Sequence, residues 1–177
     1  MFTLLAFRLL WGLVGGHWSR FANFIYSPAA VLRYLRGESS DDEHHEVGHS
    51  PLGAFSVFAL LGVLSAQVAT GLFADDEIAN TGPLTRFVSG ATSSLLTRWH
   101  KLSGQWLIVM LIVLHVAAIV FYVVGRRRNL VHPMVLGDKP LPPGVPASVD
   151  RWSTRGLAAL LLTLCAAGVA WLVSLGG

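Results

Sequence analysis

Charged residues are scarce in this sequence. Asp, Glu, Lys and Arg make up 13% of its 177 residues, about half the share of ~25% that is typical of soluble domains. Hydrophobic residues make up 53%, and the mean hydropathy is +0.58. This composition excludes an ordinary soluble domain and predicts a single integral membrane domain over residues 1–177.

Other features that carry chemistry are also absent or nearly so. Cys165 is the one cysteine and lies in an apolar run, which excludes an intrachain disulfide and a Cys-x-x-Cys site. The patterns G-x-x-x-x-G-K-[ST], G-x-S-x-G and H-E-x-x-H do not occur. The first residues lack the charged start and the cleavage site of a signal peptide. Nothing in the sequence therefore points to a hydrolytic or nucleotide-binding site.

Four apolar segments are predicted to cross the membrane, which makes the fold an all-α integral membrane helical bundle. They cover about residues 1–16, 53–74, 99–125 and 156–175. The first segment is short, because at ~1.5 Å per residue it spans roughly 24 Å of a ~30 Å hydrocarbon core. The last contains Ala166 and Ala170, a small-xxx-small pair that suits close helix packing.

The first connection contains one further helix signal. Ser27 and Pro28 are typical of a helix start and predict a short amphipathic helix through Arg36 on the lipid surface. The following run, residues 38–46, is interpreted as a solvated loop. Its two adjacent histidines also fit a metal-binding tract, but nothing in the sequence fixes their geometry; they are His44 and His45.

The other two connections are predicted to be irregular. Residues 75–97 form a loop that Gly82 and Pro83 interrupt, with room for one short surface helix. Residues 126–155 are rich in proline and are expected to be extended.

Basic residues are distributed unevenly over the connections. The first and third together carry nine: Arg20, Arg33, Arg36, Arg126, Arg127, Arg128, Lys139, Arg151 and Arg155. The second carries two, Arg86 and Arg98, offset by three acidic residues. Cytoplasmic loops are enriched in Lys and Arg, so the first and third connections are predicted to face the cytoplasm of a multi-pass protein in a bacterial inner membrane.

Two histidines stand out in the third apolar segment. His100 lies at its outer start and His115 in its inner half, with no charge between Leu102 and Tyr122. Fifteen residues of α-helix leave the two rings only ~60° apart around the axis and ~22 Å apart along it. Gly104 is on the same face and leaves room for a flat ligand against the backbone.

This arrangement predicts that His100 and His115 are axial ligands to the iron of two haems b, one near each side of the bilayer. Neutral imidazole is a good haem ligand, and ionisable groups at membrane depth are usually functional. Each histidine alone has a simpler interpretation: His115 as an interhelical hydrogen-bond partner, and His100 as an interfacial residue.

Three further residues are candidates for contact with a haem propionate. Arg8 lies inside the first apolar segment, where a guanidinium is costly unless it reaches headgroups or pairs with an anion. Both alternatives stay open for Arg8. His17 and His49 lie where their segments meet the cytoplasm, and an interfacial polar role is favoured for both.

Several motifs in order along the chain resemble the bacterial di-haem cytochrome b561 family, which includes the b-type cytochrome subunit of nickel–iron hydrogenases. They are F-R-L-L-W-G (7–12), G-H-S-P-L-G-A (48–54), T-G-L-F-A-D-D-E-I (70–78), L-H-V-A-A (114–118) and N-L-V-H-P-M-V-L-G-D-K (129–139). The resemblance implies a helical bundle with two haems b that passes electrons between quinone and a hydrogenase or c-type cytochrome. It also implies one axial ligand to each haem from His100 and His115.

Two departures from the family pattern matter. The histidines are fifteen residues apart here, whereas fourteen is usual in such helices. The opposite axial ligands of the family come from positions that would precede Met1. We therefore expect the native polypeptide to have an additional N-terminal helix with a histidine, and a second histidine shortly before Met1.

The sequence favours an electron-transfer subunit over a self-contained enzyme. The main alternative is a non-redox membrane anchor or assembly subunit with a degenerate haem site. A third is a small transporter that uses His115 as a proton relay.

The charge distribution generates the first prediction. A reporter enzyme that is active only after export is expected to be inactive when it is fused at Pro142, because the basic connection holds that site in the cytoplasm. An active fusion at Pro142 would reverse the topology and the side that each histidine faces.

Overall fold

The computed structural model describes residues 1–38, 47–127, 129–137, 141 and 143–176. Its helices are α1 (Phe2–Val14), α2 (Pro28–Arg36), α3 (Pro51–Leu72), α4 (Gly90–Arg98), α5 (Gln105–Val120), α6 (Val131–Leu136) and α7 (Trp152–Ser174). Within the described ranges, the one β feature is an isolated bridge between Asp75 and Thr81. The predicted 38–46 loop, with His44 and His45, lies outside the described residues except for Glu38.

Three helices are long and apolar enough to cross a membrane: Pro51–Leu72, Gly90–Gly125 and Trp152–Ser174. The fourth apolar helix, α1, is shorter. The fold is therefore an all-α membrane bundle, as predicted. Side chains along α5 are not buried within the protein, so its apolar surface is free to face lipid.

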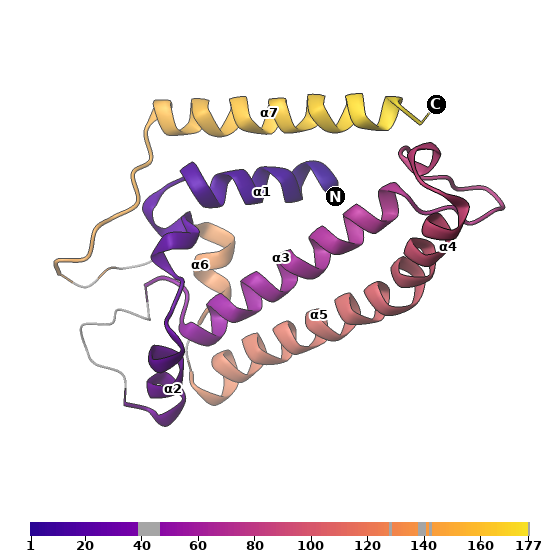
Figure 1. The fold of residues 1–177 in the computed structure, drawn as a ribbon. Helices are drawn as coiled ribbons and strands as arrows, with labels where there is room; N and C mark the ends of the chain where they lie inside the picture. Colours follow the sequence, from indigo (N-terminus) through magenta and orange to yellow (C-terminus); the bar gives the residue numbers. More distant parts are fainter. Residues whose placement is uncertain (39–46, 128, 138–140, 142, 177) are drawn as a thin grey trace.

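The helices pack in pairs. Figure 1 shows α7 beside α1, and α3 beside α5, with contacts between α1 and α3 joining the two pairs. Trp18 donates from its ring nitrogen to the Pro146 carbonyl at 3.0 Å, ahead of α7, and Gly176 at the other end of α7 lies directly against Pro83. Both ends of α7 are thus held against connections of the bundle.

The third apolar segment is longer than predicted. Its helix begins at Gly90 and not near residue 99, because the Ser89 hydroxyl accepts a hydrogen bond from the Thr92 amide and caps it. From Gly90 to Gly125 the helix is continuous, with α geometry in α4 and α5 and π-helical turns at Trp99–Gly104 and Phe121–Gly125. The short helix that was expected within residues 75–97 is thus present as α4, but it continues into the membrane segment and is not a separate surface helix.

The rest of the 75–97 connection is folded over the C-terminal end of α3 and over α4. The Asp75 amide donates to the Thr97 hydroxyl at 2.9 Å, and the Ser93 hydroxyl donates to the Phe73 carbonyl at 2.8 Å. Asp76 accepts hydrogen bonds from the Asn80 side chain and from backbone amides, which hold the pKa of its carboxyl far below the usual range. This connection forms an ordered cap.

The amphipathic helix is present as predicted. The Ser27 hydroxyl accepts from the Ala30 amide, Pro28 is the first helical residue, and the helix ends before Gly37, whose φ of 75° favours glycine. The Tyr34 and Tyr122 hydroxyls are hydrogen-bonded at 2.9 Å, which ties α2 to the C-terminal end of the long helix. The third connection contains the short helix α6, which the sequence did not predict.

The tie between α2 and the long helix can be tested. Tyr34→Phe removes the hydroxyl and should raise amide hydrogen exchange in α2 by roughly fivefold, the effect of one net hydrogen bond. Exchange in α3 serves as the reference and should not change. Unchanged exchange in α2 would mean that the tyrosine pair does not hold this helix.

Candidate functional site

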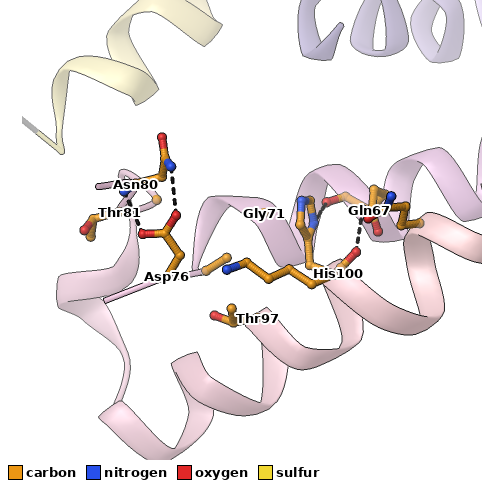
Figure 2. Close-up of a pocket in the computed structure, with 11 residues that line it drawn as sticks. Gln67, Gly71, Asp76, Asn80, Thr81, Thr97 and His100 are labelled. Atoms are coloured by element: carbon orange, nitrogen blue, oxygen red, sulfur yellow. Dashed lines mark hydrogen bonds between the residues drawn. The ribbon is translucent and has the colours of Figure 1, made fainter. Parts of the chain in front are cut away.

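His100 lies on the π-helical turn, and its ring packs against α3 (Figure 2). The ring Nδ1 lies 2.9 Å from the Gln67 carbonyl oxygen and 3.3 Å from the Thr70 hydroxyl. A carbonyl oxygen can only accept, so the proton is on Nδ1 and the lone pair is on Nε2. In the neutral tautomer that this contact selects, Nε2 is the nitrogen available to a ligand.

Gly71 allows this close approach. A Cβ atom at Gly71 would lie 2.8 Å from His100 Cε1 and 3.2 Å from Nδ1. Both distances are shorter than an ordinary van der Waals contact, so the ring occupies the space of the missing side chain. The sequence pattern did not single out Gly71.

A pocket of about 550 Å³ opens beside His100, under the cap formed by the second connection. This volume is within the range of ~300–1,000 Å³ that is typical of ligand and cofactor sites. His100, Gly71 and Lys101 contribute to its wall, and the cap contributes Asp76, Asn80 and Thr81 (Figure 2). The pocket is therefore accessible to a ligand that binds the His100 ring.

His115 repeats the arrangement further along the same helix. Its Nδ1 lies 3.1 Å from the hydroxyl oxygen of Ser56 on α3. Ser56 and Gln67 are eleven residues apart on one uninterrupted α-helix, so they lie within ~20° of each other around its axis. One face of α3 therefore provides a partner for Nδ1 of both histidines.

Gly104 is buried, and the structure shows what fills the space beside it. A Cβ atom at Gly104 would overlap Gln67 Oε1 and lie 2.6 Å from the Trp99 ring. In this structure the glycine lets α3 approach the long helix. Its predicted contact with a flat ligand remains a prediction.

Arg8 and His49 lie near each other, and neither contributes to the pocket beside His100. The Arg8 guanidinium donates to the Ser19 carbonyl at 3.3 Å and lies 5.0 Å from the centre of the Phe21 ring. Burial lowers the pKa of His49, and the charge of Arg8 lowers it further. His49 Nδ1 is buried with no hydrogen-bond partner among the described residues. A contact of Arg8 or His49 with a propionate stays a prediction, and so does one of His17, which packs edge-on against Trp18.

The site residues that the sequence did not identify are those on α3. Gln67 and Ser56 are polar residues inside an otherwise apolar span, and the sequence motifs do not include either of them. The usable signal was their spacing of eleven residues, which returns to the same face of a helix. A single imidazole with a free Nε2 suits a metal whose other ligands come from a macrocycle, and the described residues contain no group of three or more metal-binding side chains.

Known proteins with similar sequences were compared with the chain. The sequence model of the family described as prokaryotic cytochrome b561 matches residues 1–137. A similar protein is the probable Ni/Fe-hydrogenase B-type cytochrome subunit of Cupriavidus necator, with 29% identity over 145 residues, 73% of this chain and 59% of that relative. The chain thus spans less than two thirds of the relative's length, and no solved structure matches it.

The contact between Gly71 and His100 generates a prediction with a matched control on the same helix. Gly71→Ala should push the His100 ring away from the Gln67 carbonyl and lower the free energy of unfolding by about 1–2 kcal/mol. The higher helix propensity of alanine offsets part of this loss. Gly62→Ala has the same propensity gain, but no atom lies within 4 Å of its added Cβ. Thermal unfolding in detergent should separate the two variants, and equal stabilities would contradict the contact.

Proposed function

The chain belongs to the prokaryotic cytochrome b561 family, and from this premise we propose that it carries electrons across the membrane through two haems b. In this proposal the chain exchanges electrons between the quinone pool of a bacterial inner membrane and a redox partner. It is an electron-transfer subunit and does no bond chemistry of its own. The proposal treats residues 1–177 as one cytochrome b domain.

The observation that carries the proposal is the shared hydrogen-bonding of the two histidines. The Nδ1 of His100 donates to the Gln67 carbonyl oxygen, and the Nδ1 of His115 is hydrogen-bonded to the Ser56 hydroxyl. Both partners are on α3. Histidines that bind a metal usually make such a second hydrogen bond, which fixes the tautomer and raises the basicity of the ligating nitrogen. We assign Nε2 of His100 and of His115 as one axial ligand to each haem.

Haem b, when bound, supplies an iron centre that gains and loses one electron. The residues of this chain orient and tune that centre. The hydrogen bond on Nδ1 stabilises the more electron-rich imidazole, and the apolar helix around His115 lowers the local dielectric. Gly71 and the pocket beside His100 leave the Nε2 side of the ring accessible, so the described residues fit the group.

The positions of the two histidines support transfer across the bilayer. They are fifteen residues apart on one continuous helix, which corresponds to ~22 Å along its axis. One lies under the outer cap and the other in the inner half. Two centres at these depths would let an electron cross most of the hydrocarbon core in one internal step.

An apolar pocket of about 710 Å³ at the inner end is our candidate site for the quinone. Val123 of the long helix and Val131 and Val135 of α6 line it together with Arg127 and His132. Its size and apolar wall suit a quinone ring and the start of its tail. His132 is placed to exchange a proton with the quinone, which takes up protons when it accepts electrons and releases them when it gives electrons up.

The partner is proposed from the relative. That protein is described as a hydrogenase cytochrome subunit, which favours a nickel–iron hydrogenase as the electron donor. A c-type cytochrome is the alternative. In either case we expect docking at the outer cap, because the pocket beside His100 opens there.

The proposal predicts that His100→Ala and His115→Ala each remove one haem and leave the protein inserted. Haem content and reduced-minus-oxidised spectra of the complete gene product in its membrane would measure this. His132→Ala is the control, because it changes a histidine in the inner pocket and should keep both haems. If either of the first two variants kept the full haem content and spectrum, that histidine would not be a ligand.

A further inference from the structure

The long helix contains a π-helical turn at the position of His100. The turn covers Trp99–Gly104, between the α geometry of α4 and that of α5. A π turn accommodates about one extra residue in a helix, is rare, and occurs frequently at functional sites. The turn therefore changes the direction of one histidine relative to the other.

The size of this change follows from helix geometry. One residue of register rotates a side chain by ~100° about the axis. The π turn absorbs one of the fifteen residues between His100 and His115, so the two rings are separated as if by fourteen residues of α-helix. Fourteen residues fall ~40° short of four full turns, so the rings are ~40° apart around the axis. Without the π turn, His100 would point ~100° away from its present direction and away from Gln67.

The Gln67 side chain lies inside this turn. Its Nε2 donates to the His100 carbonyl oxygen at 2.8 Å, and its Oε1 lies against Gly104 one turn further along (Figure 2). A side chain inserted into the backbone hydrogen-bond ladder is an established cause of local helix distortion. Any residue larger than glycine at position 104 would overlap the amide.

The insertion has a cost. Gln67 Oε1 is buried and has no hydrogen-bond partner among the described residues. An unpaired buried acceptor destabilises the protein, and apolar side chains of similar volume, such as Met, would avoid the penalty. A glutamine that is unfavourable for packing suggests a role beyond packing.

We propose that Gln67 is a positioning residue, whose amide holds open the π-helical turn at Trp99–Gly104 and thereby directs His100 towards the outer haem. The part of this inference that concerns the haem rests on the proposed function. The part that concerns the π turn does not. Gln67 holds both ends of the same residue: its backbone carbonyl accepts from the His100 ring, and its side chain donates to the His100 carbonyl.

The test combines Gln67→Met with deletion of Leu102 in the complete protein. Gln67→Met keeps the volume and the backbone carbonyl but removes the amide donor. Deletion of Leu102, an exposed residue of the turn, removes the extra residue and restores α geometry without moving His115 relative to His100. If the amide holds the π turn, it is needed only when the extra residue is present.

The expected result is a strong coupling between the two changes. Gln67→Met alone should raise amide hydrogen exchange in residues 99–105 about five- to tenfold and shift the electron paramagnetic resonance signal of the outer haem, with the inner haem unchanged. In the deletion background the same substitution should change exchange less than twofold. Ala69→Met is the control, because it places the same side chain at an exposed position of α3 that does not line the pocket, and it should have no effect in either background.

Equal effects of Gln67→Met in both backgrounds, or no effect in the undeleted protein, would overturn the inference. If the deletion variant does not accumulate in the membrane, Gly104→Ala replaces it. This substitution displaces the Gln67 amide and should produce the same exchange and the same spectrum as Gln67→Met. The double variant, Gly104→Ala with Gln67→Met, should show no larger effect than either single variant. The proposed function is tested separately: it fails if His100→Ala retains the outer haem. The exchange measurement tests only the π turn, because it does not depend on haem.

Discussion

The pair of hydrogen bonds between the histidine Nδ1 atoms and α3 is the interaction on which the site depends. It fixes the tautomer of His100 through a carbonyl that can only accept, and it places both rings on one face of the long helix. Since α3 is α-helical throughout, the direction of the histidines depends on the geometry of the long helix and on the Gln67 side chain that lies in its π turn. Everything proposed for the cofactor follows from these two contacts.

The connection between α3 and α4 is a folded cap and not a simple loop. Asp75, Ser93 and Thr97 join the cap to the ends of α3 and α4, and Asp76 organises its turn. The cap is built over the His100 pocket and is contacted by the end of α7, which lies beyond the part of the chain that the family model matches. The structure therefore couples the pocket to a helix outside the shared family region.

Much of the fold was predictable because membrane helices are long and apolar, and the caps at Ser27 and Ser50 are local signals. The start of the long helix was missed, because Gly90–Arg98 is polar and its capping serine resembles a turn residue. The two histidines were found from spacing, but the π turn was not, since it arises from the Gln67 side chain of a different helix. Gly71 and Ser56 were missed for the same reason: their roles depend on which face of α3 meets the long helix.

The central claim is that each histidine ligates its own haem b on this chain. Redox titration of the purified complete gene product, followed optically together with its haem-to-protein ratio, tests this most directly. The account predicts two haems b per chain that titrate as two separate one-electron steps. A single haem per chain, or none above trace level, would contradict it.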